Sequence, residues 1–177
     1  MKLPHRVALL GIVRKGGAGA EIGVFRARFS ECMLEITRPK ILYLFDAWRK
    51  LPGMLPTMTN EWHRGNLYRV MESMRAHVAA GVVRPVCCLS SEAPKYVPDG
   101  SLDWVYIDAD HSYASCLADL CAWWSKVKPG GHVMGHDYHE KREPGVPKAV
   151  AEFRARHGLP APGVTEDPIP SYWWVKP

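Results

Sequence analysis

The most informative segment of the chain is Leu102-Asp-Trp-Val-Tyr-Ile-Asp-Ala-Asp-His-Ser-Tyr113. Its first half is an apolar run of residues that favour strands, and it ends abruptly at Asp108, Asp110 and His111. In open α/β sheets, ligands bind beyond the carboxyl ends of the strands. The segment therefore predicts a buried strand that carries site residues at its tip.

A second segment, His132-Val-Met-Gly-His-Asp-Tyr-His139, shows the same pattern, in which a short strand-like run is followed by an acid and histidines. If the two predicted strands are neighbours, Asp108, His136 and Asp137 converge at one edge of the sheet. Carboxylates and imidazoles gathered at such an edge can transfer protons or hold a metal ion. An enzyme is therefore the leading interpretation.

Apolar runs alternate with segments of helical periodicity along the whole chain. The predicted strands cover residues 19–24, 41–45, 82–89, 102–107, 132–135 and 171–176. The predicted helices centre on residues 29–36, 67–78, 117–127 and 146–153. Met71 is expected on the apolar face of the second helix, and Trp124 is expected to face the core from the third. Pro129-Gly130-Gly131 is expected to end the third helix. Strands that alternate with helices require crossover connections, so we expect a mostly parallel sheet covered on both faces.

Length and composition limit the possibilities further. The 177 residues are enough for a single domain, expected over 1–177, and 47% of them are apolar. The five cysteines are odd in number and lack metal-site spacing, so we expect free thiols and a cytoplasmic protein. No apolar run is long enough to span a membrane. The net charge of +5 is scattered along the chain, which does not favour a nucleic-acid partner.

The first two predicted strands indicate which cofactor to expect. No Gly-x-Gly-x-x-Gly follows the first strand, and no Gly-Lys-Ser/Thr is present, so a pyrophosphate cofactor is not favoured. Glu21 and Gly23 stand at the end of the first strand and Asp46 at the end of the second. A carboxylate in the position of Asp46 can accept hydrogen bonds from both ribose hydroxyls, although a turn cap is an alternative role. Gly23 is either a ligand contact or a turn glycine.

Five short motifs together resemble one known family: Gly19-Ala-Glu-Ile-Gly-Val-Phe-Arg-Ala-Arg-Phe-Ser30, Tyr43-Leu-Phe-Asp-Ala-Trp48, Val105-Tyr-Ile-Asp-Ala-Asp-His-Ser-Tyr113, Lys128-Pro-Gly-Gly131 and Gly135-His-Asp-Tyr138. Across residues 17–155 the chain resembles class I S-adenosylmethionine-dependent methyltransferases. The later motifs are similar to a small subgroup, the macrocin and mycinamicin sugar O-methyltransferases and cephalosporin hydroxylase-like proteins. The resemblance implies a Rossmann-like methyltransferase fold with a seven-stranded sheet. The chain departs from the family pattern at Phe25 and Ala27, which stand where glycines are usual.

The resemblance also implies positions for the cofactor. Glu21 and Gly23 would lie against the methionine part of S-adenosylmethionine, and Asp46 would bind its ribose. Ser90 or Ser91 would lie near the adenine. The other residues of these motifs that are expected at the cofactor are Phe25, Ser30, Ala47, Trp48, Asp108, Ala109 and Asp110.

The expected reaction is methylation of a small-molecule or sugar hydroxyl, with His111, Asp108 and Asp137 as catalytic residues. Metal-dependent methyltransferases of the catechol type hold their ion with acids from the same two strand tips. Asp108, His136 and Asp137 would in that comparison bind Mg²⁺ or Mn²⁺. His111 stands where that comparison has a basic catalytic residue, and an imidazole is a suitable general base near neutral pH.

Other interpretations stay open at this point. Asp108-Ala109-Asp110 is also the Asp-x-Asp pattern of metal-dependent glycosyltransferases, and a nucleoside-binding module without catalysis is a third possibility. Asp110 could instead cap the helix that begins near Ser112, and His136 could be a core histidine. The short chain predicts an open acceptor pocket. A second subunit of a homodimer could complete this pocket.

Overall fold

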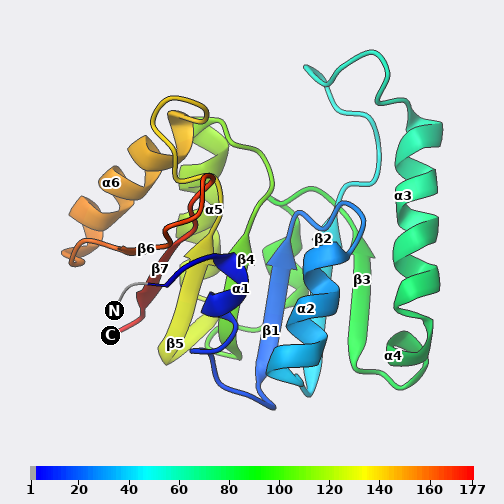
Figure 1. The fold of residues 1–177 in the computed structure, drawn as a ribbon, viewed down its shortest axis with the longest axis horizontal. Helices are drawn as coiled ribbons and strands as arrows, with labels where there is room; N and C mark the ends of the chain where they lie inside the picture. The colour runs from blue at the N-terminus through cyan, green and yellow to red at the C-terminus, as the bar shows by residue number, and fades with distance from the viewer. Residues whose placement is uncertain (1–2) are drawn as a thin grey trace.

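A seven-stranded sheet runs through the centre of the molecule in the order β3-β2-β1-β4-β5-β7-β6 (Figure 1). The computed structural model describes residues 3–177. The strands are β1 (Ala18–Ile22), β2 (Ile41–Asp46), β3 (Val83–Cys87), β4 (Leu102–Ile107), β5 (Val127–Gly135), β6 (Gly163–Val164) and β7 (Tyr172–Val175). The first five are parallel, and β7 pairs antiparallel with β5 and β6. The predicted fold class, a mostly parallel sheet with helices on both faces, is confirmed.

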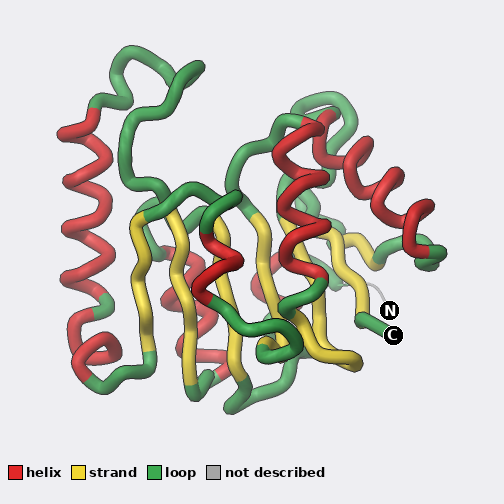
Figure 2. The backbone as a smooth tube through the Cα atoms, turned by 180° about the vertical axis from the view of Figure 1, so that it is seen from behind, coloured by secondary structure: helices red, strands yellow, loops and turns green. Residues whose placement is uncertain are grey.

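Helices cover the sheet on two sides (Figure 2). They are α1 (Arg6–Leu9), α2 (Arg28–Thr37), α3 (Asn60–Ser73), α4 (Arg75–Ala79), the 3₁₀ turn η1 (Ala93–Tyr96), α5 (Tyr113–Trp124) and α6 (Gly145–His157). One apolar core joins α1, α2 and α3 to Trp104 and Tyr106 of β4. The other joins α5 and α6 to Val105 and Ile107 of the same strand. No helix within residues 3–177 has the length and apolarity needed to cross a membrane.

Two predictions around α5 and β5 are wrong. Pro129-Gly130-Gly131 does not end a helix but lies inside β5, where the register against β4 is irregular: Leu102 pairs with Val127, whereas Trp104 pairs with His132. Proline and glycine are tolerated at such a bulge. Trp123, not Trp124, is fully buried, because the core face of α5 also carries the buried Asp119 and so runs one residue earlier than its apolar pattern indicates.

The remaining differences lie at the edges of the sheet. β3 is shorter than predicted, and as an edge strand it exposes Arg84 and accommodates Pro85. The helix predicted over 67–78 breaks at Met74 into α3 and α4, and Met71 is exposed rather than part of the apolar face. The short elements α1 and β6 were not predicted.

The turn after β1 lies very close to the residues that follow β4. Gly23 has φ +88°, and a Cβ added to it would lie 1.9 Å from the carbonyl oxygen of Asp108. Its N–H donates to the Phe45 carbonyl at 2.8 Å, while the Asp108 N–H donates to Ile22 at 2.7 Å. Backbone hydrogen bonds thus connect the turn to the ends of both β2 and β4, and they fix the relative positions of the three strand tips.

We expect Gly23→Ala to lower the free energy of unfolding by roughly 3 kcal/mol or more, because it adds both a left-handed φ penalty and a backbone clash. Gly16→Ala is the matched control, since Gly16 has φ +67° with open space around its Cβ position. That control should cost about 1–2 kcal/mol. Urea unfolding measures both values, and equal losses in the two variants would contradict the close approach.

Candidate functional site at the tips of β1, β2, β4 and β5

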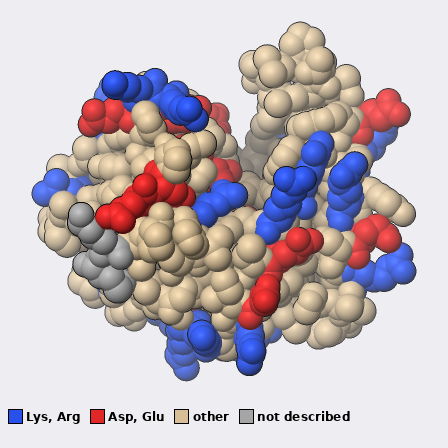
Figure 3. Space-filling view, in the orientation of Figure 1, with Lys and Arg blue, Asp and Glu red and all other residues tan. Residues whose placement is uncertain are grey.

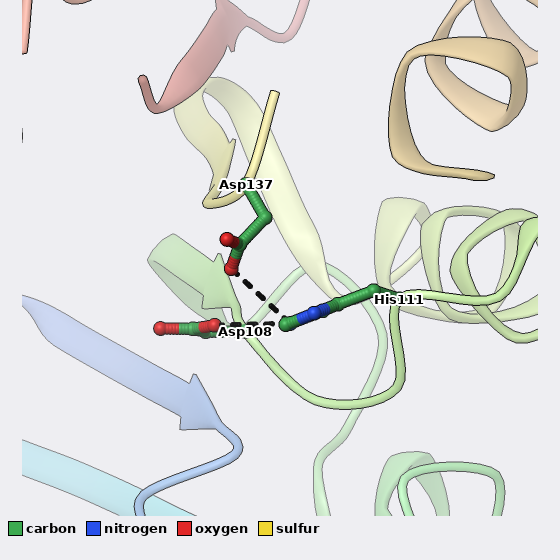
Figure 4. A group of neighbouring side chains, drawn as sticks. All are labelled: Asp108, His111 and Asp137. Atoms are coloured by element: carbon green, nitrogen blue, oxygen red, sulfur yellow. Dashed lines mark ion pairs between the residues drawn. The ribbon is translucent and has the colours of Figure 1, made fainter. Parts of the chain in front are cut away.

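Asp108, His111 and Asp137 meet at the carboxyl ends of β4 and β5 (Figure 4). Nε2 of His111 lies 3.5 Å from Oδ1 of Asp108 and 3.2 Å from Oδ2 of Asp137. One ligand atom from each of the three residues lies within 4.8 Å of the other two. Asp108 directly follows β4, His111 precedes α5, and Asp137 follows β5 in a left-handed conformation with φ +56°.

Acidic neighbours strongly favour the protonated form of His111. The Asp108 carboxylate is the largest cause, followed by the charge of Asp137, and Glu143 adds to them from 3.6 Å at Nδ1. Together they outweigh burial and raise the pKa of His111 to about 9. At neutral pH the free protein therefore holds an imidazolium between its acids.

Two further basic side chains border this cluster. Nδ1 of His136 lies 2.9 Å from Oδ2 of Asp137 and 3.8 Å from Oδ2 of Asp108. Arg6 of α1 places Nη1 3.6 Å from Oδ2 of Asp108, and its guanidinium lies 4.7 Å from the centre of the Phe29 ring. No motif in the sequence indicates Arg6, because its position depends on how the N-terminal segment folds back over the sheet.

Asp46 organises the loop that connects β1 to α2. Oδ2 accepts hydrogen bonds from the N–H groups of Val24 at 3.0 Å and Phe25 at 2.8 Å, and Oδ1 accepts one from Trp48 at 2.8 Å. Phe25 and Ala27 have φ +56° and +62°. The loop therefore keeps the backbone shape that glycines would adopt, although larger residues stand at both positions.

Glu21 is a fully buried carboxyl group beneath this loop. Ser30 of α2 hydrogen-bonds to its Oε2. Burial is the main reason that the pKa of Glu21 is raised to about 8; Ser30 and Arg6 oppose the shift, whereas the charges of Asp108 and Asp46 add to it. Glu21 and Ser30, both predicted at the cofactor, thus lie together, and Glu21 is largely protonated at neutral pH.

The other predicted site residues lie farther along the same edge. Ser90 is half-buried after β3, near the buried Asp119 of α5, whereas Ser91 is exposed. Asp110 is not the cap of α5, because the cap is Ser112; its carboxylate accepts hydrogen bonds from the Ser112 N–H at 2.8 Å and from the Ser115 hydroxyl at 3.1 Å. Ala47 and Ala109 are half-buried beside Asp46 and Asp108.

The protonation of Glu21 leads to a pH-dependent stability. In the unfolded chain the carboxyl has its ordinary pKa of 4.5, so between pH 4.5 and about 8 the unfolded chain has lost this proton while the folded protein keeps it. Wild-type stability should therefore fall over this range relative to Glu21→Gln, which cannot ionise. The difference should reach a few kcal/mol and level off above pH 8, since each pKa unit is worth about 1.4 kcal/mol.

Chemical denaturation at several pH values measures this difference, with Glu35→Gln, an exposed glutamate of α2, as the control. The control should show no such trend. A constant difference between wild type and Glu21→Gln from pH 5 to 8 would mean that Glu21 is ionised throughout.

Solved structures share this fold at low sequence identity. A protein from Corynebacterium glutamicum is 13% identical with a TM-score of 0.63, over 96% of this chain and 77% of its own. A candidate methyltransferase from Streptococcus mutans, in complex with SAH, is 11% identical with a TM-score of 0.62, over 93% of this chain and 91% of its own. An rRNA methylase from Streptococcus thermophilus is 10% identical with a TM-score of 0.61, over 95% and 91%. These likenesses establish the fold alone.

No curated protein sequence matches the chain. A family model described as a methyltransferase domain matches residues 19–138. The match covers most of the chain and includes all the strand tips described above, from Glu21 to Asp137. The chain therefore belongs to the family of methyltransferase domains.

Proposed function

We propose that the protein transfers the methyl group of S-adenosylmethionine to a hydroxyl oxygen of a small-molecule or sugar acceptor. The observation that carries this proposal is the meeting of Asp108, His111 and Asp137 beside the loop that follows β1. Membership of the methyltransferase domain family supplies the reaction class. The resemblance of the later motifs to sugar O-methyltransferases supports a hydroxyl acceptor.

The proposed cofactor site spans the tips of β1, β2 and β4. Glu21 and Gly23 would lie at the methionine part and Ser90 at the adenine. The Asp46 carboxylate has about four lone-pair positions, and three are filled by N–H groups, so it can still accept from a ribose hydroxyl. The remaining proposed contacts are Phe25, Ser30, Ala47, Trp48, Ser91, Asp108, Ala109 and Asp110.

The acceptor hydroxyl must lose its proton as its oxygen bonds to the methyl carbon and the carbon–sulfur bond breaks. His111 is the proposed general base, oriented by Asp108 and Asp137. With a pKa of about 9 the imidazole already holds a proton in the free protein. Its action as a base therefore requires that another positive group offset the charges of the two acids.

The residues present fit a divalent cation as that group. The carboxylates of Asp108 and Asp137 offer the charged ligand atoms, and Nδ1 of His136 lies beside both of them. Nε2 of His111 is buried and makes no well-directed hydrogen bond, and it stays outside the proposed ligand set so that it can act as the base. Oxygen ligands favour Mg²⁺, and an added imidazole extends the choice to Mn²⁺. When bound, such an ion lowers the pKa of a coordinated hydroxyl. His136, the ligand proposed from the sequence, lies beside the same acids.

The glycosyltransferase interpretation is less well supported. It requires the carboxylates of Asp108 and Asp110 to share one metal ion. Asp110 instead bonds to the start of α5 and is not part of the cluster formed by Asp108, His111 and Asp137. A nucleoside-binding module without catalysis would retain cofactor affinity and show no turnover.

Calorimetric titration with S-adenosylmethionine should show binding, and a screen of hydroxyl acceptors should show release of S-adenosylhomocysteine. Asp137→Asn should lower turnover about 100-fold or more, because the acid that holds His111 is lost. Affinity for the cofactor should change less than about threefold, since the variant keeps the shape of the site. Asparagine also tolerates the left-handed backbone found at this position.

Asp99→Asn, an exposed carboxylate at the opposite end of β4, controls for a general effect of charge. Binding of a uridine-diphosphate sugar or NAD in place of S-adenosylmethionine would refute the proposal. Cofactor binding without turnover on any acceptor would favour the non-catalytic module.

Metal binding has its own test. Titration with Mn²⁺, followed by electron paramagnetic resonance, should show one site that Asp108→Asn and Asp137→Asn weaken by about tenfold or more, because each removes a charged ligand. Asp110→Asn should bind as wild type does. A loss in Asp110→Asn that equals the loss in Asp108→Asn would restore the Asp-x-Asp interpretation, and no binding by wild type would exclude the metal-assisted route.

A further inference from the structure

Three side chains with nitrogen atoms that lack a hydrogen-bond partner among residues 3–177 gather where the loop after β1 meets α3. Arg26 belongs to the loop, and His63 and Asn66 lie one turn apart in the N-terminal half of α3. Nε of Arg26 donates to Oδ1 of Asn66 at 2.8 Å, which joins the two elements and fixes the orientation of the amide. None of these residues has a part in the methyl-transfer chemistry proposed above.

Two buried nitrogen atoms at this junction have no hydrogen-bond partner in the described part of the chain. Asn66 is only 2% exposed and His63 7%. Nδ2 of Asn66 and Nε2 of His63 are both buried without a hydrogen-bond partner among residues 3–177. Buried polar groups in folded proteins are almost always paired, so two orphaned atoms on one helix face require an explanation. An acceptor that is not part of the chain supplies one.

Arg26 adds a positive charge that no acid neutralises. Among the described residues its guanidinium hydrogen-bonds to Asn66 and forms no ion pair. The guanidinium is held instead by aromatic rings, 4.8 Å from the centre of Phe25 and 5.6 Å from the centre of Trp62. Four of its five N–H groups remain available, in a planar arrangement that suits an oxyanion.

The surroundings favour a negative group as well. α3 is 14 residues long and its N-terminus, capped by Thr59, carries the positive end of the helix dipole. Lys and Arg side chains gather on this face of the molecule, in the area between α2 and α3 (Figure 3). Phe25, which is 48% exposed, leaves its ring open to solvent beside the guanidinium. Positive charge and unpaired buried nitrogen atoms therefore lie together beside an exposed aromatic ring.

We propose that Arg26, His63 and Asn66 bind an oxyanion, a phosphate or carboxylate group of a ligand. The Phe25 N–H bonds to Asp46, so this site adjoins the loop that would hold S-adenosylmethionine. The anionic group belongs either to the methyl acceptor or to the amino-acid part of the cofactor. Assigning it to one of these rests on the proposed function, whereas binding of the oxyanion itself does not.

Titration with inorganic phosphate and with acetate, at constant ionic strength, tests the site directly by calorimetry or by chemical shifts of the α3 amides. Wild type should bind at least one of the two anions. Arg26→Gln and Asn66→Leu should each weaken binding by about tenfold or more, because each removes donors that the anion needs. Arg28→Gln, an equal change of charge at an exposed position two residues away, should bind within about twofold of wild type.

Asn66→Leu also separates binding from folding, because it removes the unpaired buried Nδ2 group together with the single hydrogen bond that Arg26 donates to Oδ1. It should still fold, since the gain from removing the unpaired group offsets the loss of that hydrogen bond. No binding of either anion by wild type, or equal binding by folded Asn66→Leu, would overturn the proposal.

The source of the anionic group follows from two cofactor titrations. Weaker binding of S-adenosylmethionine by Arg26→Gln, with unchanged binding of 5′-methylthioadenosine, assigns the site to the cofactor carboxylate. Unchanged binding of both, with phosphate binding lost, assigns it to the acceptor. Because the phosphate titration requires neither cofactor nor turnover, failure of this site and failure of the proposed methyl transfer give different results.

Discussion

The close approach of Gly23 to the end of β4 is the constraint on which the site depends. A side chain at this position would overlap the Asp108 carbonyl, and its N–H bonds to the end of β2. The turn therefore sets the distance between the acids at the ends of the three strands. Asp46 and Asp108 are brought to one edge by backbone packing rather than by attraction, since like charges repel one another, and the buried Glu21 beside them keeps its proton.

Strained backbone is concentrated at the same edge. Phe25, Ala27, Trp48 and Asp137 all have positive φ, and all lie in the turns that follow β1, β2 and β5. Each costs free energy that glycine would not. Asp46 compensates by accepting N–H groups from both Phe25 and Trp48, so one carboxylate stabilises two strained turns. Phe25 places an aromatic ring where a glycine would leave open space, and this ring lies against the guanidinium of Arg26 in the proposed oxyanion site.

How far the sequence predicts the structure depends on whether the dominant interaction is local. β4 was predicted to the residue, because a continuous apolar run bounded by polar residues needs only its own pattern. The meeting of Asp108 and Asp137 follows from strand order. The core face of α5 was misplaced because Asp119, which is buried, belongs to a residue type that is usually exposed. The bulge of β5, the contact of Arg6 with Asp108, and the junction of Arg26 with Asn66 arise from packing between distant segments, which no local pattern records.

The balance of charge around the site bears on how the proposed reaction would be driven. Asp46, Asp108, Asp137 and Glu143 gather at the strand tips, and Arg6 and His111 offset them. An acid-rich edge attracts the positive sulfonium of S-adenosylmethionine. Methyl transfer turns that sulfonium into a neutral sulfide, so the attraction is lost when the product forms. The same acids that orient His111 would therefore hold the reactive cofactor more tightly than its product, and release of the product would follow from the chemistry itself.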